Sequence, residues 1–333
     1  QRKRPAGGGL TAYLEDLAAK QEHINLGAVD RREAGLEAAT KWPRLVEVYV
    51  PLQTETAADG GERQRLEKHG GMAELPRGEA RRLSALQVAG RKGPLVILGD
   101  PGFGKSTFLR HFVFCLAKHR LEPGGSWLKR LPGWPSEQSD RIPILIVLPD
   151  LDDWLPRENT HPGAGNVWAY IESQLKHSNL RSAGTSLLRA LDGGKAIIVL
   201  DGLDEVRTVE GRQRIARAVH AVTVRYKKCR VLVTCRVRSY QPPGSPDEPD
   251  LRLPGFRTTT LAPLEPRAIH AFVDAWYAER ERLGALGLGE GASMAGSLRA
   301  AIEEQGLGEL ASNPLLLTVM AQVHAHHGRL PTS

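Results

Sequence analysis

A short apolar run that leads straight into a glycine-rich octapeptide narrows the possible folds of this chain. The run Leu95–Leu98 consists only of apolar residues, as in a strand that is buried on both faces of a parallel sheet. The octapeptide Gly99–Ser106 (GDPGFGKS) fits the pattern G-x-x-x-x-G-K-[ST] at every fixed position. Helical spacing follows to about Lys118. Strand, loop and helix in this order predict a phosphate-binding loop (P-loop).

Each part of the octapeptide has a task in holding a nucleoside triphosphate. Gly102 and Gly104 allow main-chain N–H groups to curl around phosphate oxygens, because glycine has no Cβ that would clash. The helix that follows adds the positive end of its dipole. We expect Lys105 to contact the β- and γ-phosphates and Ser106 to supply a hydroxyl to Mg²⁺. The predicted nucleotide-binding residues of the loop are Gly99, Asp100, Pro101, Gly102, Phe103, Gly104, Lys105, Ser106 and Thr107.

Three acidic residues follow another apolar run. Asp201 ends the run Ile197–Leu200, and a carboxylate at the carboxyl end of a parallel strand points into the crevice where open α/β sheets bind ligands. We expect Asp201 to hold Mg²⁺ through water, as a Walker B aspartate does. Of the nearby Asp204 and Glu205, one is expected to orient or deprotonate the attacking water, with Glu205 preferred. The sequence leaves that choice open, and a solvated acidic turn is the alternative.

A further apolar run ends in an arginine. Arg236 follows Val233–Cys235, and an arginine at this edge of a sheet can reach the γ-phosphate of a bound nucleotide. We therefore expect Arg236 to sense whether the γ-phosphate is present. The alternative is a surface arginine in a locally basic segment, since Arg238 lies close by.

Apolar runs typical of strands alternate with segments of helical spacing. The runs lie at residues 95–98, 142–148, 196–200, 230–234 and 258–261, and helical spacing occurs at 10–20, 78–89, 105–118, 167–175 and 212–226. This alternation predicts an α/β fold with a central parallel five-stranded sheet. The segment 45–52 is expected to be extended, and 54–71, 121–141 and 241–255 to be loops.

The order of the runs also bears on the sheet and on the domains. Because the run 142–148 comes between the P-loop helix and the Asp201 strand, we expect another strand to lie between these two in the sheet. That arrangement is typical of P-loop proteins that use a catalytic glutamate. Beyond Pro266 the spacing is helical. The predicted domains are an N-terminal helical lead-in (1–44), a nucleotide-binding domain (45–262) and a small helical domain (263–333).

Composition argues against several other classes of protein. The 333 residues are 41% hydrophobic and 25% charged, as in globular proteins, and no apolar run reaches the roughly 18–20 residues that span a bilayer. Gln1–Pro5 is not followed by the apolar segment of a secretory signal, so no membrane association is expected. Cys115, Cys229 and Cys235 lack Cys-x-x-Cys spacing, which favours buried free thiols and a cytoplasmic location. The net charge is +7, but acidic residues are interspersed, so we do not expect direct nucleic-acid binding.

Several segments together resemble the NACHT-domain NTPases. The string Ile197–Glu205 (IIVLDGLDE) is similar to the Walker B signature of that family, which has a small residue after the metal-binding aspartate and then two further acids. Four other segments agree with family motifs in chain order: Val48–Leu52, Ile142–Ile146, Thr234–Arg236 and Asn313–Leu317. The family usually has Ser where this chain has Cys235. The resemblance spans about residues 45–325 and implies that Pro314 packs near the adenosine; the alternative is a helix-starting proline.

The resemblance also implies a function. It identifies the nucleotide switch of a STAND protein, which binds ATP or ADP with Mg²⁺, hydrolyses ATP slowly and forms a homo-oligomer on activation. Such proteins have an effector domain before the switch, and a winged-helix domain and a sensor array after it. We therefore expect the chain to be a fragment that is truncated before the winged helix. The Ala-, Arg- and Gly-rich composition favours a bacterial source. For a bacterial member, the resemblance implies an immune or anti-phage sensor.

Two other functions are compatible with a P-loop. The first is an AAA-like motor that acts on nucleic acid and turns over ATP continuously; strong stimulation of turnover by DNA would favour it. The second is a scaffold that binds nucleotide without hydrolysis, which the joint presence of Asp201, Asp204 and Glu205 argues against. ATP is preferred over GTP through the resemblance alone, and no Asn/Thr-Lys-x-Asp guanine motif is present.

Overall fold

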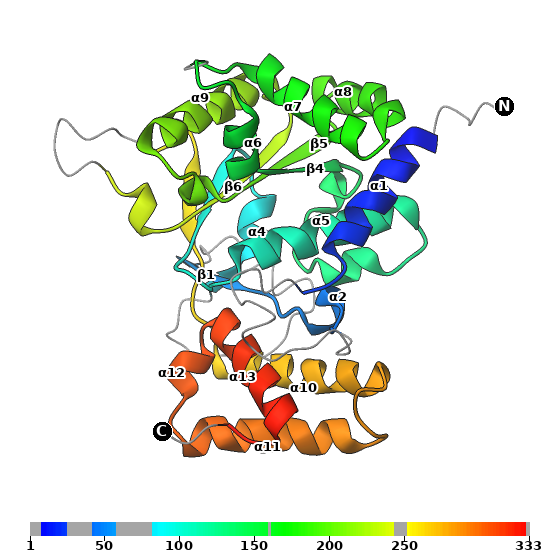
Figure 1. Cartoon of the computed structure of the whole chain (residues 1–333), viewed down its shortest axis with the longest axis vertical. Helices are drawn as coiled ribbons and strands as arrows, with labels where there is room; N and C mark the ends of the chain where they lie inside the picture. The colour runs from blue at the N-terminus through cyan, green and yellow to red at the C-terminus, as the bar shows by residue number, and fades with distance from the viewer. Residues whose placement is uncertain (1–7, 25–41, 58–81, 159–160, 243–251, 331–333) are drawn as a thin grey trace.

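A parallel sheet of five strands forms the centre of the part of the chain that the structure describes. The structure is a computed structural model and describes residues 8–24, 42–57, 82–158, 161–242 and 252–330 (Figure 1). The strands are β3 (Leu95–Leu98), β4 (Ile142–Val147), β5 (Ala196–Asp201), β6 (Arg230–Cys235) and β7 (Arg257–Thr260). The predicted five-stranded parallel α/β sheet is confirmed.

The strands have the order β4-β5-β6-β3-β7 in the sheet. A strand therefore does lie between the P-loop strand β3 and the Asp201 strand β5, as predicted. That strand is β6, whereas the run 142–147, which intervenes in the sequence, forms the edge strand β4. Chain order does not determine sheet order, because a helical crossover can pass over neighbouring strand positions.

The carboxyl ends of the central strands meet at one edge of the sheet. Leu98 at the end of β3 is paired with Cys235 at the end of β6, and Leu200 near the end of β5 is paired with Val233. Since the strands are parallel, the segments that follow them emerge side by side. The sheet thus brings the P-loop, the acidic turn and the arginine segment together.

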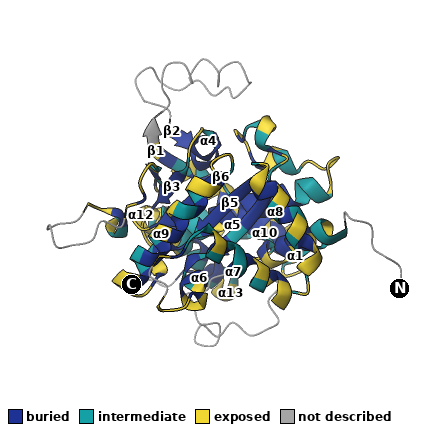
Figure 2. Ribbon diagram, turned by 90° about the horizontal axis from the view of Figure 1, so that it is seen from above, coloured by how far each residue is buried: buried dark blue, intermediate teal, exposed yellow. Residues whose placement is uncertain are grey.

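Helices cover both faces of the sheet. They are α1 (Gly8–Gln21), α5 (Lys105–Leu121), α6 (Leu148–Trp154), α7 (Ala164–His177), α8 (Gly184–Asp192) and α9 (Val209–Arg225). In Figure 1, α5 and α1 lie on one side and α7 and α9 on the other. The middle of α5 packs between the sheet and α1, and its residues from Phe108 to Ala117 are buried except for Arg110, which is half-buried (Figure 2). The Tyr13 hydroxyl of α1 donates to the main-chain oxygen of Pro143 at 3.0 Å.

A bundle of helices follows the sheet and lies beneath it in Figure 1. Its members are α10 (Pro266–Arg282), α11 (Glu290–Glu304), α12 (Gly308–Ala311) and α13 (Pro314–His327). α13 begins where its sequence predicts: Asn313 caps the helix by accepting from the main-chain N–H groups of Leu315 and Leu316, and Pro314 occupies the first turn. The helical region predicted after Pro266 is present.

The segment before the sheet differs from the prediction at two places. Residues 45–52 are not extended throughout, because Leu45–Val48 form the short helix α2 and bury three apolar side chains. Strand β1 (Gln53–Ala57) then pairs antiparallel with β2 (Arg82–Ser84). The helix predicted at 78–89 begins only at Ala85, as α4 (Ala85–Gly90), and its start up to residue 81 lies outside the described residues.

A capping box explains where α4 begins. Ser84 accepts from the main-chain N–H of Gln87 at 3.2 Å, and the Gln87 side chain accepts from the Ser84 N–H at 2.8 Å. The predicted loop 121–141 contains the short 3₁₀ helices η1 (Trp127–Arg130) and η2 (Ser136–Gln138). The loops predicted at 54–71 and 241–255 lie largely outside the described residues. In the part of the chain that is described, no helix has the length and apolarity required to cross a bilayer.

Candidate nucleotide-binding site

The P-loop joins β3 to α5 and uses two glycines in the left-handed region. Gly102 has φ of +82° and Gly104 of +79°, a conformation that other residues adopt only with strain. Gly104 is the N-cap residue of α5. The first N–H groups of a helix have no partner within it, so those at the start of α5 are available to an anion.

Lys105 lies folded back on the loop. Its ammonium group donates to the main-chain oxygens of Gly99 at 2.6 Å and Asp100 at 3.2 Å. Partial burial lowers the pKa of Lys105, while the nearby carboxylates of Asp204 and Asp201 counteract that shift. The lysine is thus held at the loop by neutral carbonyl groups, which a phosphate can replace with charged oxygens.

Ser106 and Asp201 are brought together from α5 and β5, as the sequence predicts. The Ser106 hydroxyl donates to Oδ1 of Asp201 at 3.1 Å, and the Thr234 hydroxyl of β6 donates to the same oxygen at 2.5 Å. Thr234 in turn accepts from the main-chain N–H of Gly202 at 2.9 Å. These contacts fix the Asp201 carboxylate beside the start of α5.

The donor set at Ser106 and Asp201 fits Mg²⁺. A hydroxyl and a carboxylate are oxygen ligands, which this hard cation prefers. Within the described ranges, no group of three or more His, Cys, Asp or Glu side chains is placed to hold a metal by itself. Mg²⁺ commonly takes one or two ligands from the protein and the others from phosphate groups and water, so Ser106 and Asp201 suffice as the protein ligands.

Asp204 and Arg236 form a close pair across the ends of β5 and β6. Oδ1 of Asp204 accepts from the Arg236 main-chain N–H at 2.8 Å, and Oδ2 lies 2.8 Å from Nε of the same arginine. The Asp204 side chain is only 3% exposed, whereas that of Arg236 is 48% exposed. Both oxygens of Asp204 are therefore engaged in fixing Arg236, which extends from this anchor towards the cavity.

Glu205 has a different environment. It keeps access to solvent and lines the cavity beside the P-loop, in the turn that follows Asp201. Partial burial, together with the carboxylates of Asp201 and Asp204, raises the pKa of Glu205. A carboxylate with a raised pKa is a stronger base, so among the acids of this turn Glu205 is the one suited to accept a proton from water.

A cavity of about 330 Å³ opens beside the P-loop, between the sheet and the helical bundle. Its polar lining includes Lys105, Ser106, Thr107, Glu205 and Arg236. Its apolar lining comes from the segment before the sheet (Leu45, Val48, Tyr49, Val50, Leu52) and from the bundle region (Leu264, Phe272, Pro314, Leu315). A cavity with both kinds of wall suits a ligand with a charged part and a flat apolar part.

The helical bundle is bonded directly to the P-loop. The Asn313 side-chain amide donates to the main-chain oxygen of Pro101 at 3.1 Å, and the Leu315 N–H donates to that of Gly102 at 3.1 Å. A Cβ on Gly102 would lie 2.6 Å from Oδ1 of Asn313. Glycine at this position therefore allows Asn313 to approach the loop, and it also allows the left-handed turn of the loop.

The structure brings all the predicted site residues to one region, together with two that the sequence analysis did not single out as site residues. Pro314 lines the cavity and also lies in the first turn of α13, so a place near the adenosine and the helix-starting role are compatible with each other. The two additional residues are Thr234, which orients Asp201, and Asn313, which bonds to the loop. Both lie in motifs that the sequence analysis noted, but there the site roles were assigned to Arg236 and Pro314. Two patterns in the sequence could have indicated these residues: a threonine near the end of an apolar run, and an Asn-Pro pair at the start of a helix.

Comparison with known proteins agrees with this geometry. A model of the NACHT domain matches residues 93–280, more than half of the chain. The matched region begins just before β3, contains the P-loop, the acidic turn and Arg236, and ends within α10. No curated protein matches the chain. By the extent of the family match, this chain belongs to the NACHT domain family of P-loop NTPases.

Proposed function

We propose that this NACHT module binds ATP with Mg²⁺ in the cavity between the sheet and the bundle, and hydrolyses it slowly as a conformational switch. The observation that carries the proposal is the shared cavity: the P-loop, the segment before the sheet and the bundle all contribute lining residues. A ligand that fills such a cavity interacts with each part and stabilises their closed arrangement.

Each polar side chain of the site has a separate proposed role towards the triphosphate. Lys105 exchanges its carbonyl partners for phosphate oxygens, and Ser106 and Asp201 hold Mg²⁺. When bound, the metal neutralises charge on the phosphate groups. Glu205 orients the attacking water and accepts its proton, because Asp204 is committed to Arg236. Arg236, fixed by that pair, senses the γ-phosphate.

The apolar walls support a purine base next to the triphosphate site. Tyr49 and Val50 line the cavity and provide an apolar surface on which a flat base can pack. The preference for ATP over GTP is supported by membership of the family alone.

Several wider properties remain part of this proposal. Oligomerisation on activation, effector and sensor domains in the same protein, and a role in immune or anti-phage signalling are supported only by membership of the family. We also propose 45–262 as the nucleotide-binding domain and 263–333 as the helical domain. Because α1 packs against α5, it is best counted with the nucleotide-binding body.

Replacement of the P-loop lysine tests the proposal. Lys105→Ala should abolish binding of a fluorescent ATP analogue with Mg²⁺ while the melting temperature changes little, since the ammonium group donates to main-chain oxygens of the loop and not to the packed core. The matched control is Lys118→Ala, which removes the same charge from the same helix at an exposed pair with Glu122. Unchanged affinity in Lys105→Ala would refute the P-loop assignment. If the unsubstituted protein binds ATP but does not hydrolyse it, the proposed hydrolysis is refuted and the proposed ATP binding stands.

A further inference from the structure

Residues 44–52 form a wall of the nucleotide cavity that belongs to neither the sheet nor the bundle. Their apolar side chains line the cavity, and α2 within this segment lies between α5 and α10 (Figure 1). The short α2 helix has too few hydrogen bonds to be stable by itself. Its position therefore depends on what holds it from either side.

On the side of the sheet, η1 and α5 hold the segment. Arg130 donates to the main-chain oxygen of Val46 at 2.6 Å and to Oε2 of Glu47 at 2.9 Å. The ring of Tyr49 stacks on His111 of α5, with centroids 3.7 Å apart and planes inclined by 11°. These contacts fix the middle of the segment.

On the side of the bundle, one buried carboxylate holds the first residue of the segment. Oε1 of Glu279 in α10 accepts from Nε of Arg44 at 3.1 Å, and Arg282 donates to the same carboxylate at 2.5 and 2.7 Å. The Glu279 side chain is only 2% exposed, while that of Arg44 is 32% exposed. A buried carboxylate is stable only when it is paired, so Glu279 requires these two arginines.

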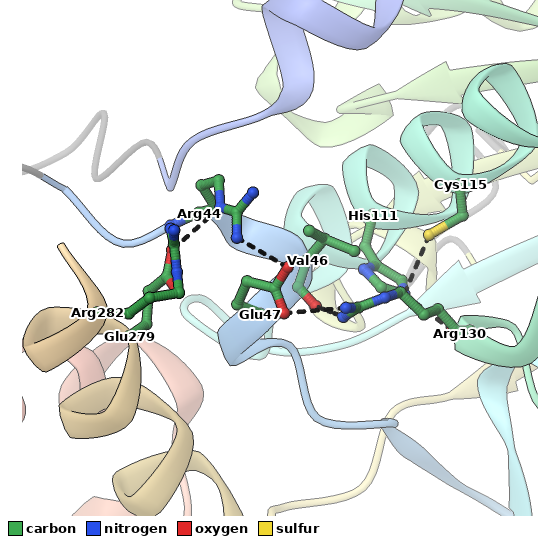
Figure 3. A network of polar contacts seen from close by, with 8 residues as sticks. All are labelled: Arg44, Val46, Glu47, His111, Cys115, Arg130, Glu279 and Arg282. Carbon is green, nitrogen blue, oxygen red and sulfur yellow. Dashed lines mark hydrogen bonds and ion pairs between the residues drawn. The ribbon is translucent and has the colours of Figure 1, made fainter. Parts of the chain in front are cut away.

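The two sides are joined by alternating charges. Arg44 also donates to Oε1 of Glu47 at 3.1 Å, so that Arg282, Glu279, Arg44, Glu47 and Arg130 form one continuous series from the bundle to the sheet body (Figure 3). Burial tends to raise the pKa of Glu279, but its hydrogen bonds from Arg282 and Arg44 outweigh burial and lower the pKa. The carboxylate is thus charged at neutral pH, and its hold on Arg44 is electrostatic as well as geometric.

We propose that Glu279 is a positioning residue for the base-binding wall: through Arg44 it holds residues 44–52 against the cavity, so the bundle sets the affinity for the nucleoside part of the ligand. This inference rests on the proposed function, that the cavity takes ATP. Lys105 and Ser106, which we propose to contact the triphosphate, belong to the P-loop and bond to Gly99 and Asp201 rather than to this carboxylate. Loss of its charge should therefore weaken recognition of the base and leave recognition of the phosphates unchanged.

The test compares ATP with inorganic tripolyphosphate, both with Mg²⁺, by calorimetric titration of the 333-residue chain. Glu279→Gln keeps the size of the side chain and removes its charge. We expect ATP to bind roughly tenfold more weakly, as loss of one charge-assisted contact implies, and tripolyphosphate to bind within about twofold of the original affinity. Hydrogen exchange of the amides in residues 44–52 should accelerate in the nucleotide-free variant.

The matched control is Asp274→Asn. Asp274 is also on α10 and also pairs with an arginine, but that arginine is Arg299 of α11 rather than a residue of 44–52, and the Asp274 side chain is 53% exposed. This control should change neither affinity nor exchange. Arg44→Met tests the same pair from its more exposed side and should reproduce the split between ATP and tripolyphosphate, even if a melting curve shows that Glu279→Gln is poorly folded.

The outcomes separate the inference from the proposed function. An equal loss for ATP and tripolyphosphate, or unchanged ATP affinity in both Glu279→Gln and Arg44→Met, would overturn the positioning role while leaving ATP binding intact. Failure of the unsubstituted chain to bind ATP would overturn the proposed function, and the positioning role with it. A selective loss for ATP together with faster exchange in residues 44–52 would support the inference.

Discussion

Substitution of Gly102 by alanine tests whether the P-loop is also the attachment point of the helical bundle. Gly102 has φ of +82°, and an added Cβ would lie 2.6 Å from Oδ1 and 3.0 Å from Nδ2 of Asn313. The Asn313 side chain cannot move away freely, because it donates to Pro101 and accepts from the first N–H groups of α13. Gly102→Ala therefore introduces backbone strain and also displaces a side chain that holds the bundle.

The two effects can be estimated separately. The left-handed conformation costs an alanine about 1–2 kcal/mol. Displacement of Asn313 forfeits a helix cap, about 0.5–2 kcal/mol, and a hydrogen bond to the loop, about 1 kcal/mol. Gly102→Ala should thus lower the free energy of unfolding by about 2.5–5 kcal/mol. Gly255→Ala is the control for strain alone, since Gly255 has φ of +77° and no atom within 4 Å of an added Cβ.

Urea denaturation of the single variants and a double-mutant cycle with Asn313→Ala provide the measurement. Asn313→Ala removes the same cap and the same bond to Pro101, so it should add little once Gly102→Ala is present. The expected coupling is about 1–3 kcal/mol. If Gly102→Ala is no more destabilising than Gly255→Ala, or if the two substitutions are additive, the loop and the bundle are not attached in the way described.

Three further predictions concern hydrolysis, the core and acid stability. Glu205→Gln should retain ATP binding and slow turnover by about 10²–10⁴-fold, whereas Asp204→Asn should chiefly impair the response to the γ-phosphate; a single-turnover assay that finds the reverse would exchange their roles. Asp152→Asn should lower the free energy of unfolding by about 3–5 kcal/mol, measured by urea denaturation. The Arg214 guanidinium is buried and its Nε lies 3.1 Å from Oδ1 of Asp152, so the substitution removes the negative charge with which it is paired. Burial lowers the pKa of His111 from 6.5 to about 4, so the folded state binds fewer protons than the unfolded chain and stability falls as the pH drops from 6.5 towards 4. His111→Phe should reduce that loss by roughly 3 kcal/mol, and parallel pH dependence of the two proteins would contradict this.

Local patterns predicted the sheet because each strand of this fold is recognisable by itself. The run Leu95–Leu98 and the octapeptide after it required only strand, turn and helix propensities that agree with one another. The order of the strands in the sheet could not be predicted from these local patterns, since the position of β6 between β3 and β5 results from long-range packing. The helix at Leu45–Val48 was missed for a related reason: its stability comes from contacts with α10 and α5 rather than from its own four residues.

The same distinction applies to the site. That Lys105, Ser106 and Asp201 lie close together could be predicted from the sequence, because the chemistry of phosphate and Mg²⁺ restricts which residues occur at such positions. The roles of Asp204 and Glu205 could not be separated, since both are acids in one turn. In the structure Asp204 is buried against Arg236 and Glu205 faces the cavity, a difference created by the neighbouring strand β6. These catalytic roles remain predictions until turnover is measured.

The polarity of the peptide unit suggests why nucleotide and bundle should be coupled at this loop. The main-chain oxygens of Pro101 and Gly102 accept from Asn313 and Leu315, whereas the N–H groups at the start of α5 are left for an anion. A phosphate that accepts from such N–H groups polarises the loop, and hydrogen bonds in a connected series strengthen one another. We therefore expect phosphate binding to tighten the attachment of the bundle. By linkage, contacts that favour the attached bundle must raise the affinity for nucleotide by the same factor.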